Sequence, residues 1–347
     1  MHWFGVSAAC RHEGFHPLSI FEAADGKLWS CDIKPEILIT QSIVHTYSQP
    51  LIDAFVVHDY CGTENRSEIL NSHAQSVRAI AGGNVDAALL DRLPNLELIS
   101  NFGVGYDSID VKAALSRGVS ITYTPNVLNE AMAEITIGLM VASARNLVAA
   151  DRYVRDGKWE KGPYPLQREL NGGRAGIIGL GRIGKSIAER CIAMGMKVAY
   201  HGRRRQADQP YDYYDSALAL AQAVAWLVVV APGGPETEGM VSREVLEALG
   251  PEGTLVNMAR GTLVDEIALI DLLQSGGLGW AALDVFAQEP HVPEALRRLE
   301  NVVLSPHQGS ATIATRAAMG KLVVDNIKAH FAGEPLLTPI PEMAASS

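Results

Sequence analysis

Three ionisable side chains in the second half of the chain follow directly after segments that read as buried strands. They are Arg260, Glu289 and His307, which come after residues 254–257, 280–286 and 302–305. Ligands of open parallel sheets bind beyond the carboxyl ends of the strands, so the three residues are candidates for one common site. A cation, an acid and a histidine on one rim can hold an anionic substrate and move a proton.

A glycine pattern lies upstream of these residues. The short apolar run 176–178 precedes Gly179, Gly181 and Gly184, which are spaced as G-x-G-x-x-G, and isoleucines at 183, 187 and 192 follow at helical spacing. The first glycine permits a tight turn, the second lets a pyrophosphate approach the backbone, and the third lets helix and strand pack closely. The free N–H groups of the new helix would hold the pyrophosphate. The pattern predicts a dinucleotide site; the alternative is an ordinary glycine-rich turn between a strand and a helix.

The end of the next predicted strand indicates which dinucleotide is used. NAD-binding enzymes place an acid there, roughly 20 residues after the glycines, to bind the ribose 2′-hydroxyl. Here the segment 200–205 reads Tyr-His-Gly-Arg-Arg-Arg and contains no acid. Arginines pair with a 2′-phosphate, so we expect NADP(H), with Arg203 and Arg204 as contacts, and NAD(H) as the less favoured cofactor. The alternative is a solvated basic turn.

Composition narrows the class of protein. The 347 residues are 48% hydrophobic and 20% charged, with a net charge of −10 and no lysine or arginine block longer than 203–205. This argues against a nucleic-acid footprint and against binding to an anionic membrane surface. The four cysteines are scattered without metal-type spacing, which predicts a reduced, cytoplasmic protein without a metal site. The longest apolar run, 223–231, is too short to span a bilayer.

Strand and helix patterns alternate along most of the chain, which predicts an α/β fold with parallel sheets covered by helices on both faces. Expected strands of the first half are 35–40, 55–58, 77–80, 96–100 and 120–122; those of the second half are 176–178, 197–200, 225–230, 254–257, 280–286 and 302–305. A long apolar helix, 128–150, and an irregular arm, 157–167, separate the two halves, and a closing helix, 311–331, is expected to return to the first half. Residues 1–33 lack this patterning and are expected to be a disordered extension, or an upstream start that is not part of the fold.

Five segments together resemble the D-isomer-specific 2-hydroxyacid dehydrogenases. They are residues 101–106 (NFGVGY), 179–184 (GLGRIG), 257–266 (NMARGTLVDE), 284–290 (DVFAQEP) and 305–312 (SPHQGSAT). The resemblance runs from about residue 34 to about residue 339. It implies two doubly wound parallel-sheet domains with a cleft between them. A flavodoxin-like substrate domain would comprise 34–126 and 311–339, and a Rossmann-type cofactor domain 127–310.

The resemblance also implies roles for the three strand-end residues. Arg260 would bind the substrate carboxylate and polarise its carbonyl group. His307 would be the general acid of ketone reduction, and Glu289 would pair with His307 and favour the imidazolium. The alternatives are a structural salt bridge for Arg260, a packed core histidine for His307 and an exposed loop carboxylate for Glu289.

Further residues receive expected roles in the same way. Val104 and Gly105 would offer backbone N–H groups to the substrate carboxylate, and Asp284 would hold the nicotinamide carboxamide unless it is only a strand-end cap. The full set of expected cofactor contacts is Gly179, Leu180, Gly181, Arg182, Ile183, Gly184, Arg203, Arg204, Pro232, Met258, Ala259, Arg260, Asp284, His307 and Gly309.

Within the family, the basic turn and the Gly-Pro-Tyr-Pro arm are most similar to the glyoxylate/hydroxypyruvate reductases. The expected activity is NADPH-dependent reduction of a small 2-keto acid to the D-2-hydroxy acid. Two alternatives stay open: an NAD(H)-dependent dehydrogenase of other substrate range, and a dinucleotide-sensing interaction protein similar to the family's corepressors. The 128–150 helix and the arm that follows it resemble the family's dimer-forming element, so a homodimer is expected.

Overall fold

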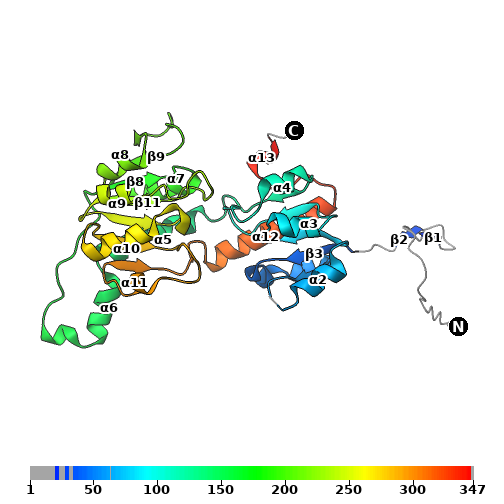
Figure 1. Ribbon diagram of the computed structural model, residues 1–347, viewed down its shortest axis with the longest axis horizontal. Helices are drawn as coiled ribbons and strands as arrows, with labels where there is room; N and C mark the ends of the chain where they lie inside the picture. The colour runs from blue at the N-terminus through cyan, green and yellow to red at the C-terminus, as the bar shows by residue number, and fades with distance from the viewer. Residues whose placement is uncertain (1–19, 23–27, 31–33, 63, 345–347) are drawn as a thin grey trace.

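The computed structural model describes residues 20–22, 28–30, 34–62 and 64–344. These residues build two parallel sheets in two lobes that lie side by side (Figure 1). Within the extension 1–33, the short strands β1 (Ile20–Glu22) and β2 (Leu28–Ser30) pair antiparallel. The disorder predicted for the rest of that extension falls outside the described residues.

The first lobe contains a five-stranded sheet. Its strands are β3 (Glu36–Ile39), β4 (Val56–Asp59), β5 (Val77–Ala81), β6 (Leu98–Ser100) and β7 (Ser120–Thr122). They are ordered β4-β3-β5-β6-β7 and all pairs are parallel. Counted along the chain this order is 2-1-3-4-5, so the predicted flavodoxin-like sheet is confirmed.

Alternating side chains of this sheet enter two separate cores. Leu38 and Ile80 lie in the core on one face, and Ile37 and Ile39 lie in the core on the other. The helices of this lobe are the 3₁₀ helix η1 (Ser42–Tyr47), α1 (Gln49–Ala54), α2 (Arg66–His73), α3 (Ala87–Arg92), α4 (Val111–Ser116), α12 (Ile313–Phe331) and α13 (Pro341–Ala344). Consecutive apolar residues such as Ile37, Leu38 and Ile39 thus bury both faces of the sheet.

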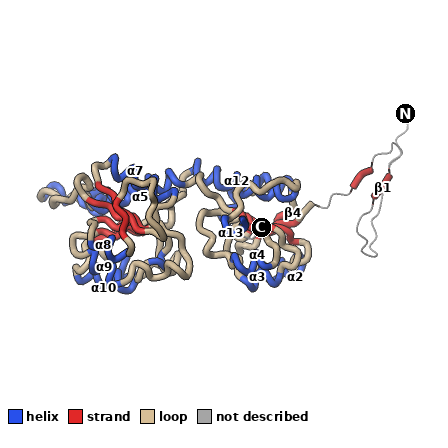
Figure 2. Tube along the Cα trace, turned by 90° about the horizontal axis from the view of Figure 1, so that it is seen from above, coloured by secondary structure: helices blue, strands red, loops and turns tan. Residues whose placement is uncertain are grey.

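Helix α12 returns from the second half of the chain, as the closing pattern predicted. It lies along the lobe of the five-stranded sheet (Figure 2) and packs against β5 and β6. The Ser100 hydroxyl donates a hydrogen bond of 3.2 Å to the Val323 carbonyl. The division of the chain into a domain of 34–126 with 311–339 and a domain of 127–310 stays a prediction.

The second lobe contains a seven-stranded parallel sheet. Its strands are β8 (Arg174–Ile178), β9 (Lys197–His201), β10 (Asp212–Tyr214), β11 (Trp226–Val229), β12 (Thr254–Asn257), β13 (Trp280–Leu283) and β14 (Val302–Leu304). The order β10-β9-β8-β11-β12-β13-β14 reads 3-2-1-4-5-6-7, which confirms a Rossmann-type sheet. Among the segments of this lobe that the sequence patterns missed are edge strand β10, helix α8 (Ala217–Gln222) and helix α11 (Glu294–Arg297). All three are too short to carry a clear period.

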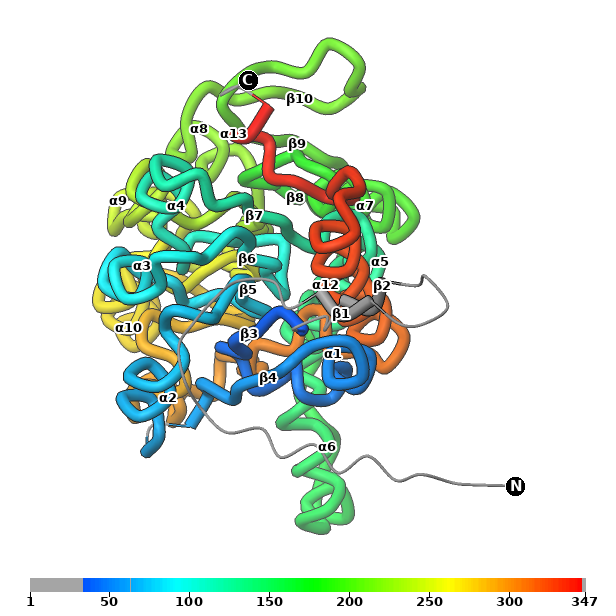
Figure 3. Tube along the Cα trace, turned by 90° about the vertical axis from the view of Figure 1, so that its right-hand side faces the viewer, coloured from blue at the N-terminus to red at the C-terminus, as the bar shows by residue number. Residues whose placement is uncertain are grey.

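Helices cover both faces of this sheet as well. Besides α8 they are α5 (Asn129–Ala144), α6 (Leu147–Arg155), η2 (Lys158–Lys161), α7 (Arg182–Ala193), α9 (Arg243–Leu249), η3 (Gly261–Leu263), α10 (Glu266–Ser275) and α11 (Glu294–Arg297). Figure 3 shows that α6 extends away from both sheets.

The prediction of one continuous helix over 128–150 is wrong. Helix α5 ends at Ala144 and α6 begins at Leu147, with a bend of 60° between them. Asn146 adopts a left-handed conformation (φ 45°), which asparagine tolerates better than most residues and which ends the helix. No single described helix is long and apolar enough to cross a membrane; α5 and α6 pass that test only when the bent pair is taken together.

The glycine turn packs β8 against α7. A Cβ on Gly184 would lie 2.3 Å from the Gly179 carbonyl oxygen, and Gly179 itself has φ 99°. Both positions therefore require glycine, for the reasons the spacing predicted. The prediction that Ile192 belongs to the apolar face of α7 is wrong, because Ile192 is 49% exposed while Cys191 is fully buried. Cys191 lies four residues after the buried Ile187 and so shares its face of the helix, whereas Ile192 lies five after it.

Candidate active site

Arg260 is fixed by the turn that follows β12. The Asn257 side chain is buried; its amide donates to the Arg260 carbonyl at 2.9 Å and its oxygen accepts from the Ala259 N–H at 3.1 Å. A Cβ on Gly261 would lie 1.9 Å from the Phe286 carbonyl carbon, so this turn packs directly against the loop after β13. The backbone of Arg260 is therefore held rigidly at the carboxyl end of the sheet.

The guanidinium of Arg260 contacts the other lobe. Its Nε and Nη2 lie 3.2 Å and 3.1 Å from the two carboxylate oxygens of Asp107, and its Nη1 donates to the Ala259 carbonyl at 2.8 Å. A guanidinium has five N–H donors, so one on Nη1 and one on Nη2 remain after these bonds. Two parallel donors at the free end of the fork match a carboxylate.

Glycines let the Arg260 side chain sit against the 101–106 loop. A Cβ on Gly105 would lie 1.9 Å from Nη2 of Arg260, and one on Gly233 would lie 2.9 Å from its Cγ. Asn101 holds this loop by donating to the carbonyls of Gly103 (3.2 Å) and Gly105 (3.0 Å). Among the described residues, the N–H groups of Val104 and Gly105 donate to no acceptor. The loop thus offers unused donors next to the free end of the guanidinium.

His307 and Glu289 form a hydrogen-bonded pair. The Nδ1 of His307 lies 2.6 Å from Oε2 of Glu289, and Oε1 of Glu289 accepts the Phe286 N–H at 3.1 Å. His307 is half-exposed, and its Nε2 has no partner within the described residues. A ring whose Nδ1 is bonded to a carboxylate has its tautomer and orientation set, which leaves Nε2 for proton transfer.

The charge state of Glu289 follows from its neighbours. Burial raises the pKa of this carboxyl, but hydrogen bonds from His307 and Phe286 and the positive charges of His307 and Arg260 outweigh burial and hold the pKa below its usual value. Because the folded-state pKa is lowered, the pair stabilises the fold at neutral pH, and this contribution is lost as the pH falls through that pKa. Glu289 is therefore an anion at neutral pH, hydrogen-bonded to Nδ1 of His307.

Asp284 shapes the loop that carries His307. Its buried carboxylate accepts hydrogen bonds from the Ser305 hydroxyl (2.5 Å) and from the N–H groups of Gln308 (2.9 Å) and Gly309 (2.8 Å). The His307 N–H donates to the Asp284 carbonyl at 2.8 Å, and His307 adopts φ 48°. Asp284 thus caps the end of the strand, which is the alternative named for it in the sequence analysis. Its contact with the nicotinamide stays a prediction.

The three strand-end residues lie where the sequence placed them. Arg260, Glu289 and His307 follow β12, β13 and β14, which are neighbours in the sheet. The charge of Arg260 also reaches Glu289, whose pKa it lowers. The arrangement joins a carboxylate-binding fork to a proton donor on one rim, and its catalytic use stays a prediction.

The glycine turn fits a bound dinucleotide. An added Cβ on Gly181 would meet no heavy atom within 4 Å, so the space beside the N-terminus of α7 is open. The first N–H with an acceptor inside this helix is that of Lys185, which bonds the Gly181 carbonyl. The N–H groups before it have no acceptor within the helix, as at any helix N-terminus, and such groups can bind an anion.

The basic turn lies against the glycine turn. The Gln206 side chain donates to the Leu180 carbonyl at 2.7 Å, and the Gln206 N–H donates to the hydroxyl of the buried Tyr200 at 2.6 Å. The arginines at 203–205 are exposed and pair with no carboxylate among the described residues. Their charge is therefore uncompensated at the place where a 2′-phosphate is expected.

The other expected cofactor contacts lie on the same edge of the sheet but have varied surroundings. Arg182 donates to the Tyr123 hydroxyl of the first lobe at 3.1 Å, and Pro232 is exposed just after β11. Met258 and Ala259 are buried in the turn after β12. A Cβ on Gly309 would clash with Met132 at 2.5 Å, so packing alone explains that glycine.

Sequence reasoning missed two residues near this site. Asp107 follows the 101–106 segment by one position, and only the fold shows that it pairs with Arg260. Gln41 follows β3, and its Oε1 is buried without a hydrogen-bond partner. The rule that ligands bind beyond carboxyl strand ends, applied to the first lobe, would have drawn attention to Gln41.

Comparison with known proteins assigns the family. Residues 137–309 match the domain described as "D-isomer specific 2-hydroxyacid dehydrogenase, NAD binding domain". The chain is also 49% identical over 278 residues to glyoxylate/hydroxypyruvate reductase A of Arabidopsis thaliana, which covers 79% of this chain and 89% of that protein. The chain belongs to the D-isomer-specific 2-hydroxyacid dehydrogenase family. It is an oxidoreductase with an NAD(P)-binding domain.

Two further relatives bear on this dehydrogenase. Hydroxyphenylpyruvate reductase of Plectranthus scutellarioides is 45% identical over 85% of this chain and 96% of its own length. The crystal structure of an NADPH-dependent glyoxylate/hydroxypyruvate reductase from Sinorhizobium meliloti, in complex with NADP and malonate, is 41% identical with a TM-score of 0.85. It covers 89% of this chain and 97% of the other.

The glycine turn gives a matched pair of variants of the dehydrogenase. Gly181→Ala should leave the unfolding temperature unchanged, because its Cβ points into open space, yet it should weaken NAD(P)(H) binding. Gly184→Ala should lower the free energy of unfolding by about 1–3 kcal/mol, because its Cβ overlaps the Gly179 carbonyl. Thermal unfolding and cofactor titration by fluorescence measure both effects. Full-strength cofactor binding by Gly181→Ala would contradict the assignment of the open space to the cofactor.

Removing Asp107 tests whether it positions Arg260. Asp107→Ala should reduce kcat/KM for a keto acid by roughly tenfold, because one charge-assisted hydrogen-bond pair that orients the guanidinium is lost. Asp107→Asn should be intermediate, since its amide oxygen still accepts one bond. Steady-state kinetics with both variants decide the matter. Tighter keto-acid binding by Asp107→Ala would instead mean that Asp107 competes with the substrate for Arg260.

Proposed function

We propose that this dehydrogenase reduces a small 2-keto acid, glyoxylate or hydroxypyruvate, to the D-2-hydroxy acid with NADPH. The observation that carries the proposal is the free end of the Arg260 guanidinium beside unpaired backbone N–H groups, on the same rim as the His307–Glu289 pair. The names of the Arabidopsis and Sinorhizobium relatives support this substrate class.

Substrate binding follows from the donors that remain unused. The carboxylate of the keto acid would accept from Nη1 and Nη2 of Arg260 and from the N–H groups of Val104 and Gly105. Asp107 and the Ala259 carbonyl occupy the other donors and keep the fork aimed at this position. Since the donors come from both lobes, a substrate held between them would also draw the lobes together.

Proton transfer would be the work of His307. The bound cofactor supplies the hydride that adds to the carbonyl carbon of the keto acid. His307 donates a proton from Nε2 to the carbonyl oxygen, while Glu289 at Nδ1 stabilises the imidazolium beforehand. For the reverse reaction the neutral ring accepts the hydroxyl proton at the same nitrogen.

The cofactor preference rests on the basic turn. Arg203 and Arg204 carry charge that no described carboxylate neutralises, and Gln206 holds their turn beside the open N-terminus of α7. A 2′-phosphate on the adenine ribose would pair with these guanidinium groups, whereas a 2′-hydroxyl would leave them unused.

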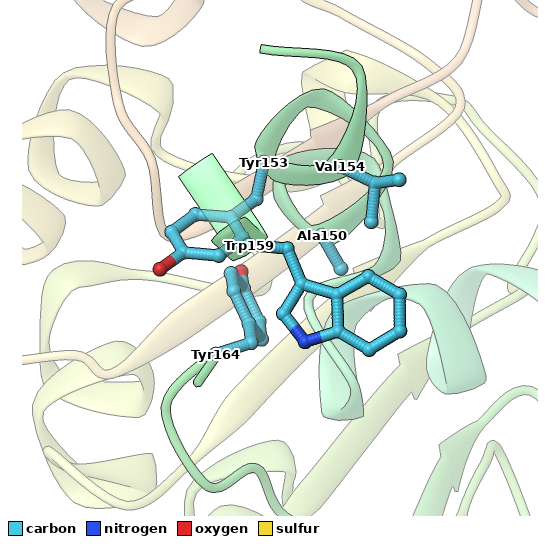
Figure 4. A pocket seen from close by; sticks show the side chains of 5 residues that line it. All are labelled: Ala150, Tyr153, Val154, Trp159 and Tyr164. Atoms are coloured by element: carbon cyan, nitrogen blue, oxygen red, sulfur yellow. The ribbon is translucent and has the colours of Figure 1, made fainter. Parts of the chain in front are cut away.

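A homodimer through α6 and the arm after it is part of the proposal. No residue of α6 is buried, and apolar side chains on this element and the arm are exposed: Leu147, Val148, Val154, Trp159 and Leu166. Figure 4 shows an apolar pocket here, lined by Ala150, Tyr153 and Val154 of α6 and by Trp159 and Tyr164 of the segment that follows it. Burial of such a surface by a second copy would remove its contact with water.

The His307–Glu289 pair predicts two distinguishable losses. His307→Ala should lower kcat by about 10²–10⁴-fold and leave NADPH binding nearly intact. Glu289→Gln should shift the alkaline limb of the pH–rate profile for reduction to lower pH, because the anion that stabilises the imidazolium is gone. Rates measured between pH 5 and 10 with saturating NADPH report both. Retention of more than about a tenth of the rate by His307→Ala would exclude its role as general acid.

The basic turn predicts cofactor preference. The wild-type enzyme should show a higher kcat/KM with NADPH than with NADH, and Arg203→Ser with Arg204→Ser should erase this preference mainly by raising KM for NADPH. Arg205→Ser, on the same turn but outside the predicted contacts, is the control. Both cofactors should be tested with several keto acids, including hydroxyphenylpyruvate, because one relative is a hydroxyphenylpyruvate reductase. Equal or better use of NADH by the wild type would contradict the assignment.

The exposed surface of α6 predicts the oligomeric state. Light scattering should give twice the mass of the 37.3 kDa chain. Trp159→Glu with Val154→Glu should give a monomer, because the charges would be buried without partners. Ile267→Glu, at an 82% exposed isoleucine of α10, is the control for added surface charge. A monomeric wild-type protein would refute the proposal.

A further inference from the structure

A cluster of two histidines and one glutamate lies in the first lobe, apart from the active site. It consists of Glu36, His58 and His73, whose nearest ligand atoms all lie within 4.8 Å of one another. We propose that these three residues bind a divalent transition-metal ion, with Zn²⁺ as the ion that the donor set suits best.

The sheet register brings the first two residues together. Glu36 is the first residue of β3 and lies two positions before Leu38, so both point to the same face of the sheet. His58 of edge strand β4 is paired with Leu38 in the parallel ladder and therefore shares that face. Leu38 belongs to the core that also contains Leu70 of α2. The paired strands thus fix two of the donors beneath α2.

Helix α2 supplies the third donor. His73 is its last residue, and its Nδ1 lies 3.1 Å from Oε2 of Glu36 on β3. The rings of His58 and His73 are 3.9 Å apart at their centroids and tilted by 30°. A cation at this end of the helix is also favoured by the helix dipole.

The three donor atoms converge on one point. Oε2 of Glu36 lies 2.6 Å from Nε2 of His58 and 3.1 Å from Nδ1 of His73. Zinc bonds of about 2.0–2.2 Å in a tetrahedral arrangement would place the same atoms about 3.3 Å apart. The two distances from Glu36 Oε2 would therefore each have to lengthen by less than about 1 Å.

The chemistry of the cluster suits a transition metal. Two imidazole nitrogens and one carboxylate oxygen form a donor set that zinc prefers and that magnesium and calcium do not. Burial raises the pKa of Glu36, but hydrogen bonds from His58 and Ser76 and the charges of both histidines outweigh it and keep the carboxyl ionised. The side chains are 13% to 39% exposed, so an ion can enter and a water can complete the coordination.

The position of the cluster gives the ion a structural use. Glu36 lies at the amino end of β3, whereas the substrate site lies beyond carboxyl strand ends. A metal here would join edge strand β4 and the end of α2 to the second strand of the sheet. It would stabilise the first lobe without touching the reaction.

Zinc binding by the full-length, chelator-stripped protein tests the proposal. Isothermal titration with ZnCl₂ measures the number of zinc ions bound per chain. This number should be higher by one in the wild type than in Glu36→Gln or His73→Phe. Gln keeps the shape of Glu36, and Phe keeps the ring contact with His58. The wild type should gain more unfolding temperature than either variant as Zn²⁺ is added.

A second cluster provides the control. His45, Asp59 and Cys61 could also attract zinc, but Asp59 follows His58 in β4 and therefore points to the opposite face of the sheet. His45→Gln should therefore leave the ion in question in place. Keto-acid reduction by Glu36→Gln should match that of the wild type, which shows that the variant is folded.

The outcomes separate cleanly. Loss of one ion in Glu36→Gln and in His73→Phe, together with an anomalous zinc signal between these residues in a crystal, would establish the site. Equal zinc stoichiometry in the wild type and both variants, or no zinc bound by the wild type, would overturn the proposal. The cluster would then be only a glutamate that is hydrogen-bonded to two histidines.

Discussion

The contact between Arg260 and Asp107 is the constraint on which the site depends. It joins the two lobes, since Arg260 follows a strand of the seven-stranded sheet and Asp107 follows a loop of the five-stranded sheet. The contact occupies one edge of the guanidinium and leaves the end of the fork free. It is only partly exposed, so water screens it less than it would a surface ion pair. The side chain that would bind substrate is therefore oriented before any substrate arrives, which reduces the entropic cost of binding.

The proton-transferring side is held in place by a second, independent set of contacts. Asp284 accepts three hydrogen bonds from the loop after β14, and this loop presents His307 toward Glu289. Glu289 is itself fixed by the Phe286 N–H. Since β12, β13 and β14 are neighbours, the arginine and the histidine share one rigid platform. Motion between the lobes would change the distance to the 101–106 loop and leave the relation of Arg260 to His307 unchanged.

Much of this could be predicted because it depends on local pattern. The spacing of Gly179, Gly181 and Gly184 predicts a strand-turn-helix unit. The close contact that requires glycine there joins Gly184 to Gly179, only five residues apart. Residues after strand ends share an edge in any parallel sheet, which placed Arg260, Glu289 and His307 together. Other features depend on contacts distant in sequence. The pairing of Asp107 with Arg260 spans 153 positions, and the break at Asn146 rests on one left-handed residue within an apolar stretch that reads as a single helix. The cluster around Glu36 required the strand register, which no sequence pattern specified.

The most direct measurement of the central claim is the structure of the enzyme with NADP and oxamate, an unreactive analogue of a keto acid. The account predicts that the oxamate carboxylate lies on Nη1 and Nη2 of Arg260, with its amide carbonyl oxygen within hydrogen-bond distance of Nε2 of His307. Oxamate held without Arg260, or an imidazole turned away from it, would contradict the account.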